Sequence, residues 1–131
     1  MSKKAFTLVE IMIVVAIIAL LAAIAIPNLL RAKMSSNDSL AQSTIRALST
    51  ATETYVTKNN GIYPSDISDL TGVTPPYISR DYCSATLAGY QYSCTNTPSV
   101  GYTYVAEPSL IGTTGTTTYT ITTGGVLTPP G

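Results

Sequence analysis

The hydrophobic positions of the chain fall into three successive patterns, and the first is an uninterrupted apolar run. From Ile11 to Ile26 no side chain is polar. With apolar residues on both flanks, this run approaches the roughly 20 residues that a helix needs to cross a bilayer. Lys3 and Lys4 precede it, and the next basic residue is Arg31. This charge bias predicts a cytoplasmic N-terminus and places the bulk of the chain on the other side of the membrane.

The second pattern follows the apolar run and is typical of an amphipathic helix. Apolar or small residues recur at spacings of three, four or seven, and most charged residues lie off this stripe. A glycine in a left-handed conformation, Gly61, would end the helix near residue 59. The repeat is too short and broken for a coiled-coil stalk, so we expect the stripe to carry a head domain. The stripe comprises Leu30, Met34, Ala41, Ile45, Leu48, Thr52 and Tyr55.

The third pattern is a strict alternation of tyrosine or isoleucine with polar residues, which is typical of half-buried strands. It occurs in three segments of the tail, and Gly124-Gly125 offers a hairpin turn. Three or four antiparallel strands would fold over the helical stripe. The predicted fold class is therefore α+β, with a long N-terminal α-helix, transmembrane and then amphipathic, packed against a small antiparallel β-sheet head. The alternating residues are Tyr90 and Tyr92, Tyr102 and Tyr104, and Tyr119 and Ile121.

Composition excludes most functions that depend on a chemical site. The chain has 131 residues, no histidine and a formal net charge of zero. A neutral chain carries no electrostatic footprint for nucleic acid, and neither a phosphate-binding loop nor a nucleophile elbow is present. We therefore expect no enzyme, no cofactor and no metal. Asp66 and Asp69 could suggest calcium, but we interpret them as solvated residues of a short helical turn capped by Ser65.

One acid, Glu10, stands near the start of the apolar run, and three readings of the segment compete. A secretory signal peptide would be cut after the small-x-small sequence Ala23-Ile24-Ala25. A plain membrane anchor would leave Glu10 at the membrane surface, with its carboxylate reaching out to water. Neither interpretation explains why Glu10 is present, since burying a carboxylate inside a bilayer costs several kcal/mol.

The third reading rests on the stretch "KKAFTLVEIMIVVAIIALLAAIAIPNLL". It resembles the N-terminus of type IV pilins and of the related pseudopilins of type II secretion. The resemblance implies a leader cut between Ala5 and Phe6 by a prepilin peptidase, although the family usually has glycine where Ala5 stands. It further implies N-methylation of Phe6, and Glu10 as an assembly residue that faces the Phe6 amine of its own or an adjacent subunit. Pro27 matches a family position at which the helix kinks or loosens.

The resemblance also divides the chain and implies its partners. Residues 1–5 would be the leader peptide, 6–30 the transmembrane and assembly helix, 31–59 the amphipathic helix of the head, and 60–131 the β-rich head. The expected function is a structural subunit of a type IV pilus, for adhesion, motility or DNA uptake, that polymerises through its N-terminal helix. A pseudopilin and a secreted soluble binding module remain the alternatives. Expected partners are identical subunits in a homopolymeric helical filament, the bilayer before assembly, the peptidase and the assembly platform. Expected locations are the inner membrane and then the cell surface, or the periplasm for a pseudopilin.

Two further features concern the exported part of the chain. Cys83 and Cys94 lie where disulfides persist, so we expect a bridge, with two buried thiols as the alternative. Asn37-Asp38-Ser39 has the form of a glycosylation sequon, but its position on the predicted helix makes the match coincidental.

Overall fold

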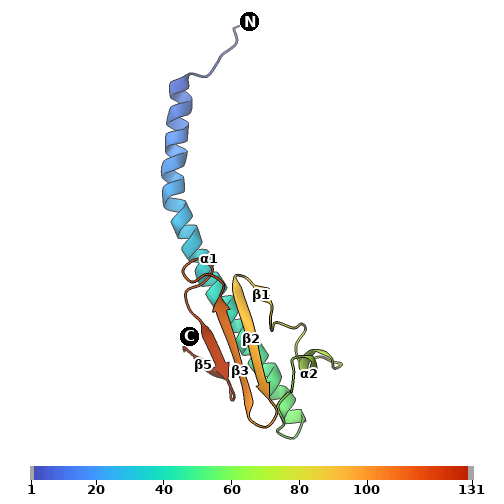
Figure 1. Ribbon diagram of the computed structural model, residues 1–131. Coiled ribbons are helices and arrows are strands. Elements are labelled where there is room, and N and C mark those ends of the chain that lie inside the picture. The colour runs from blue at the N-terminus through green and yellow to red at the C-terminus, as the bar shows by residue number, and fades with distance from the viewer. Residues whose placement is uncertain (1, 130–131) are drawn as a thin grey trace. The chain divides into compact units, whose positions relative to one another are not determined.

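A computed structural model describes residues 2–129. Met1, in the predicted leader, and Pro130 and Gly131, in the predicted head, lie outside the described residues. The chain forms two compact units that divide between Lys33 and Met34. One helix, α1 (Leu8–Lys58), contributes to both units, and the sheet belongs to the second (Figure 1).

Helix α1 ends where the sequence predicts a stop. The N–H of Gly61 donates to the carbonyl of Val56 at 3.0 Å, and Asn60 and Gly61 both have left-handed backbones, with φ of 55° and 84°. This is the arrangement of a Schellman motif. Asn60, and not only the expected Gly61, is left-handed, because asparagine tolerates this conformation better than other residues with a Cβ atom. Pro27 lies inside the helix.

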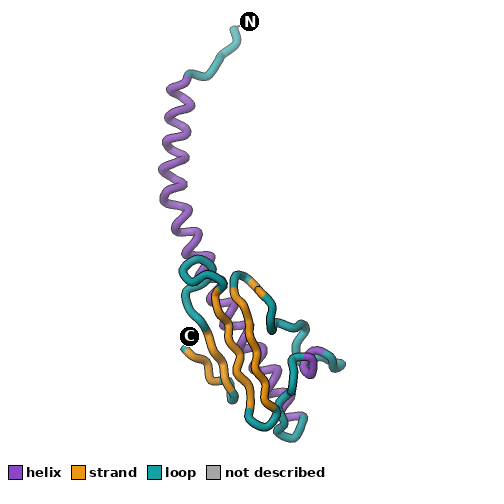
Figure 2. Tube along the Cα trace, viewed as in Figure 1, coloured by secondary structure: helices purple, strands orange, loops and turns teal. Residues whose placement is uncertain are grey.

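The five strands form one antiparallel sheet in the order β1-β2-β3-β4-β5 (Figure 2). The β2–β3 pair is the longest, with eight residue pairs from Tyr90↔Pro108 to Thr97↔Gly101. The β4–β5 turn contains Gly124 and Gly125, both with positive φ, as the sequence predicts. The strands are β1 (Thr86–Leu87), β2 (Tyr90–Thr97), β3 (Gly101–Pro108), β4 (Tyr119–Thr122) and β5 (Val126–Thr128).

The sheet packs its tyrosine face against the part of α1 that belongs to the head. All six alternating residues named above for the tail are buried, so the predicted α+β fold is confirmed. On α1 the predicted stripe is buried at Ala41, Ile45, Leu48 and Thr52. Leu30, by contrast, remains half exposed. Asn37, Thr44 and Ser49 are buried although they are polar, and each has a hydrogen-bond partner: the Thr114 carbonyl for Asn37, the Leu40 carbonyl for Thr44 and the Tyr102 hydroxyl for Ser49.

Two local predictions need correction. The short helix α2 (Ser68–Thr71) is not capped by Ser65: its N-cap is Ile67, which makes no side-chain cap bond. Instead, the carboxylate of Asp69 accepts hydrogen bonds from the N–H and the hydroxyl of Ser65, at 2.8 and 2.9 Å. A two-residue strand, β1, also escaped prediction because it is too short for alternation to be visible.

Candidate functional site

The first unit presents an apolar helical surface with nothing over it. Its large hydrophobic side chains, from Phe6 to Leu30, are between 50% and 83% exposed. Helix α1 is long and apolar enough to cross a membrane, and none of its most apolar stretch is buried within the chain. A helix that is apolar on all sides is stable only inside a membrane or a protein core. This surface must therefore be covered by lipid or by other protein.

Glu10 lies at the start of this surface and forms a capping box with Thr7. The N–H and the hydroxyl of Thr7 donate to Oε2 of Glu10 at 2.7 and 2.9 Å, and the N–H of Glu10 donates to the Thr7 hydroxyl at 3.2 Å. In this motif two side chains satisfy N–H groups that the first helical turn leaves without partners. The sequence T-x-x-E signals the motif, but sequence reasoning passed over it. The box uses one carboxylate oxygen, so Oε1 takes no part in it.

The predicted cleavage bond lies just before this capping box. Ala5 and Phe6 are exposed, and the chain has no regular secondary structure from Ser2 to Thr7. A bond in such a segment can enter the extended site of a peptidase without the unfolding of any helix. Phe6 and Glu10 border one shallow depression, together with Ile11, Ile13 and Val14. Pro27 is far along the chain from this group and is not brought to it.

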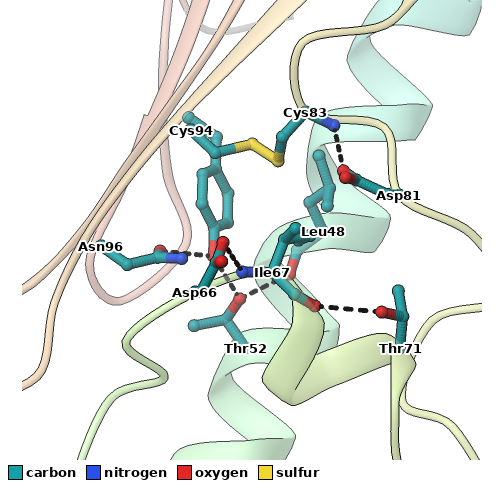
Figure 3. Close-up of a disulfide and its surroundings, with 10 residues drawn as sticks. Leu48, Thr52, Asp66, Ile67, Thr71, Asp81, Cys83, Cys94 and Asn96 are labelled. Carbon is teal, nitrogen blue, oxygen red and sulfur yellow. Dashed lines mark hydrogen bonds between the residues drawn. A yellow bond between two sulfur atoms is a disulfide. The ribbon is translucent and has the colours of Figure 1, made fainter.

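In the head, the predicted disulfide is present (Figure 3). Cys83 and Cys94 are bonded with their Cα atoms 5.5 Å apart. The bridge joins β2 to the segment that precedes β1, in which the N–H of Cys83 also donates to Asp81 at 2.7 Å. A loop of this size contributes on the order of 2–3 kcal/mol in the chain-entropy account. Because the two sulfur atoms are bonded, the alternative of two buried thiols is wrong.

Two polar residues of α1 fasten the β3–β4 loop to the helix. The side-chain amide of Asn37 donates to the carbonyl of Thr114 at 2.7 Å. Asp38 accepts from the hydroxyl of Tyr90 at 2.6 Å, from the N–H of Thr116 at 3.0 Å, and from the Thr116 hydroxyl. Burial opposes ionisation of Asp38, but the hydrogen bonds from Thr116 and Tyr90 outweigh it and lower the pKa of this carboxyl. We call Asn37, Asp38 and their partners the loop clasp.

A second polar contact lies further along α1. The hydroxyl of Tyr102 lies 2.7 Å from the Ser49 hydroxyl and donates to Glu53 at 2.9 Å, and Glu53 also accepts from the N–H of Gly124 at 2.8 Å. Burial, with the neighbouring Glu53 carboxylate, raises the pKa of Tyr102 to about 12. Burial also raises the pKa of Tyr104. This contact ties the β4–β5 turn to the helix.

Sequence reasoning missed both contacts because their partners are distant in the chain. The helical pattern places Asp38 and Glu53 among the charged residues off the stripe, whereas Asp38 meets Tyr90 across 52 positions and Glu53 meets Tyr102 across 49. The available signal was the excess of tyrosines on the inner face of the sheet, because a buried tyrosine hydroxyl needs a polar partner. Within residues 2–129, no group of three or more acidic, cysteine or histidine side chains could hold a metal ion.

Comparison with known proteins identifies the N-terminal segment and relates most of the chain to two relatives. Residues 1–26 match the family described as the prokaryotic N-terminal methylation motif. The type IV major pilin protein PilA of Myxococcus xanthus is 42% identical over 73 residues, which are 56% of this chain and 32% of that protein. The type IV wide pilus major component PilA4 of Thermus thermophilus is 37% identical over 93 residues, which are 68% of this chain and 70% of the relative. No solved structure matches significantly.

Proposed function

This chain belongs to the type IV pilins, and we propose that it is a structural subunit of a type IV pilus that polymerises through the apolar part of α1. The observation that carries the proposal is the apolar helix surface of the first unit, which nothing else in the chain covers. Lipid would cover this surface before assembly, and copies of the same helix would cover it in the filament. The subunit is a building block and not an enzyme.

Both relatives are named as major pilus components, which favours a pilus over the pseudopilus of type II secretion. A secreted binding module is disfavoured because release after Ala25 would divide the matched motif of residues 1–26. We propose that the chain, like these relatives, is a major subunit, held in the inner membrane before assembly and displayed at the cell surface afterwards. A prepilin peptidase and an assembly platform would act on it at the membrane.

We propose that maturation removes residues 1–5 and leaves Phe6 as a methylated N-terminus. The exposed segment around the Ala5–Phe6 bond supports access by a peptidase. The loss of Lys3 and Lys4 changes the count of basic and acidic side chains from 7 and 7 to 5 and 7, a net charge of −2. The intact mass of purified filaments tests this step. A chain that begins after Ala25 would contradict it.

The role that we propose for Glu10 follows from its hydrogen bonds. A carboxylate in hydrocarbon is costly, and Thr7 satisfies one of its oxygens. Oε1 would accept from the Phe6 amine of an adjacent subunit, a charged donor that exists only after cleavage. This pairing would fix the axial position of each new subunit, so Glu10 would be needed for assembly and not for folding of the head.

A set of three variants tests the role of Glu10. Glu10→Ala and Glu10→Gln should each leave the subunit at its normal level in the membrane and yield few or no sheared filaments, because both remove the charge. Thr7→Ala is the matched control: it removes the hydroxyl of the capping box, keeps the carboxylate and the bond that it accepts from the N–H of residue 7, and should retain filaments. Wild-type filament yield from Glu10→Gln would show that the charge is not needed. Equal loss from Thr7→Ala would reduce Glu10 to a helix-capping residue.

We also propose that α1 bends or loosens at Pro27 when subunits pack. Proline cannot donate to the carbonyl four residues earlier, Ala23, so the helix is weakest there. Amide hydrogen exchange in filaments should be faster around residues 23–27 than on either side. Uniform protection through this stretch would contradict the proposal.

A further inference from the structure

The head exposes two pairs of large aliphatic side chains, one beyond each end of β3. Leu110 and Ile111 follow the strand and are 62% and 72% exposed. Val100 immediately precedes the strand and is 75% exposed, and Ile62, from the turn after α1, is 56% exposed. We call Leu110 and Ile111 the rear tip, and Ile62 and Val100 the front tip. Other exposed aliphatic residues of the head stand singly, as is normal for a protein surface: Leu40, Val73 and Val126.

The rear tip sits on a loop whose backbone is fixed. The N–H of Ser109 donates to Gly89 at 2.8 Å, and the carbonyl of Leu110 accepts from Thr113 and Thr114 at 3.1 and 2.9 Å. The loop clasp then holds its far side, where Asn37 binds the Thr114 carbonyl at 2.7 Å. An aliphatic pair on a fixed loop is prepared for binding, since little loop freedom remains to be lost on contact.

The front tip is fixed in a similar way. The N–H of Tyr63 donates to the carbonyl of Pro98 at 3.1 Å, so the turn that carries Ile62 is bonded to the hairpin that carries Val100. Within the hairpin, the N–H of Val100 donates to Thr97 at 3.0 Å. The hairpin and the loop after β3 lie at opposite ends of the sheet (Figure 1). Eight residues of strand separate them, about 26 Å at 3.3 Å per residue.

We propose that in the filament the rear tip of one subunit packs against the front tip of the next. The proposal rests on the proposed function, because a filament of identical subunits needs two different surfaces that fit each other. Such a contact is heterologous and repeats without closing, and the two tips differ in residues and lie at opposite ends of one rigid strand. Neither tip carries a charge: residues 59–63, 96–103 and 109–117 contain no acidic or basic side chain. Contact between the tips therefore buries aliphatic groups, while Asp38, which binds the rear loop from α1, keeps its hydrogen bonds from Thr116.

Cysteine crosslinking in the full-length protein tests this contact. Ile111→Cys and Val100→Cys are made singly and together, and filaments sheared from cells are treated with a short bismaleimide. The native cysteines do not react because they are bonded to each other. The double variant should give a ladder of dimers, trimers and larger species on a denaturing gel, since each subunit links to the next. Each single variant should give monomer only.

The matched control pairs Ile111→Cys with Val126→Cys, a 59% exposed residue of β5 that belongs to neither tip. It should give no ladder. The proposal would be overturned if the double variant Ile111→Cys/Val100→Cys formed filaments but gave no ladder. Dimers from Ile111→Cys alone would also overturn it, because they would show that two rear tips contact each other. An absence of filaments from the wild-type strain would instead refute the proposed function.

A second measurement covers the case in which the cysteine variants do not assemble. Ile111→Asp should lower filament yield about tenfold, the factor expected when one aliphatic contact is lost from an association equilibrium. The level of membrane-bound subunit should not change, because the side chain lies outside the core. Val126→Asp should leave the yield unchanged. Normal yield from Ile111→Asp would count against the tip contact.

Discussion

Removal of the Asp38 carboxylate should release the β3–β4 loop from α1 and destabilise the head. The carboxylate accepts three hydrogen bonds, from the Tyr90 hydroxyl and from the N–H and hydroxyl of Thr116. A hydrogen bond to a charged group contributes about 1.5–3 kcal/mol when buried. Asp38 is only half-buried, so we take about 1 kcal/mol for each bond. Asp38→Ala should therefore lower the free energy of unfolding by about 2–3 kcal/mol.

The expected loss can be divided between the partners by a double-mutant cycle. Tyr90→Phe removes one of the three bonds and should cost about 1–2 kcal/mol, because the Tyr90 hydroxyl also lies 2.8 Å from the Thr117 carbonyl. Asp38→Asn keeps one acceptor oxygen and loses the charge, at about 1 kcal/mol. The double variant should cost less than the sum of the two, with a coupling of about 1 kcal/mol.

Urea unfolding of the detergent-solubilised full-length chain measures these changes. The chain has nine tyrosines and no tryptophan, so near-ultraviolet circular dichroism reports the tyrosine packing of the head directly. Ser36→Ala, at an exposed position on the same helix, is the control and should change stability by less than about 0.5 kcal/mol.

The same clasp predicts a dependence on pH with a defined sign. The pKa of Asp38 is lowered in the folded head, so its ionised form stabilises the fold above the ordinary carboxyl pKa of about 4. This contribution is lost as pH falls below that value. The stability difference between wild type and Asp38→Ala should be constant from about pH 5 to 8 and should shrink below about pH 4. This account of the clasp would be refuted if the stability losses of Asp38→Asn and Tyr90→Phe simply added in the double variant. It would also be refuted if the stability difference between wild type and Asp38→Ala did not change below about pH 4.

Two other predictions concern the tyrosines of the core. Burial raises the pKa of Tyr90, Tyr92, Tyr102 and Tyr104, that of Tyr102 to about 12; the head should thus keep its stability up to about pH 10 and lose it as pH rises towards 12. Spectrophotometric titration of tyrosinate checks this, and ionisation of all nine tyrosines at the ordinary pKa without unfolding would contradict it. Gly115→Ala should cost about 1–3 kcal/mol, because a Cβ atom there would lie 2.5 Å from a ring carbon of Tyr90. Gly112→Ala, in open space but with a φ of 79°, should cost only about 1 kcal/mol; equal melting temperatures for both variants would count against this packing.

Alternation and helical periodicity were sufficient to predict the architecture. The six tail residues that alternate are buried because a strand points every second side chain to the same face, whatever its partners are. Cys83 and Cys94 could be paired in advance because the chain offers no other cysteine. The helix stop followed from local backbone preference. The strands and the helix stop depend on residues that are close together in the chain. The disulfide could be predicted because two cysteines allow only one pairing.

The parts that could not be predicted depend on contacts between distant residues. Asp38 on a helix surface has the same local pattern whether it faces water or a tyrosine hydroxyl, and only the packed sheet brings Tyr90 to it. Ser65 is a good capping residue in isolation, yet Asp69 competes for its N–H and hydroxyl and draws it away from that role. At the N-terminus, Thr7 lies in the stretch that carries the family resemblance, and its hydrogen bonds with Glu10 form only when the first helical turn folds.

The disulfide also limits how far the head can extend under mechanical load. Cys83 and Cys94 are separated by 11 positions, a stretch that would reach about 35–40 Å if pulled straight. The bridge holds its ends 5.5 Å apart, measured between Cα atoms, so about 30 Å of contour length is withheld from any unfolding that leaves the bond intact. A head opened by force in single-molecule stretching should lengthen by that much more in reductant than in its absence. The bond therefore shortens the extension of an unfolding head by the length of this loop.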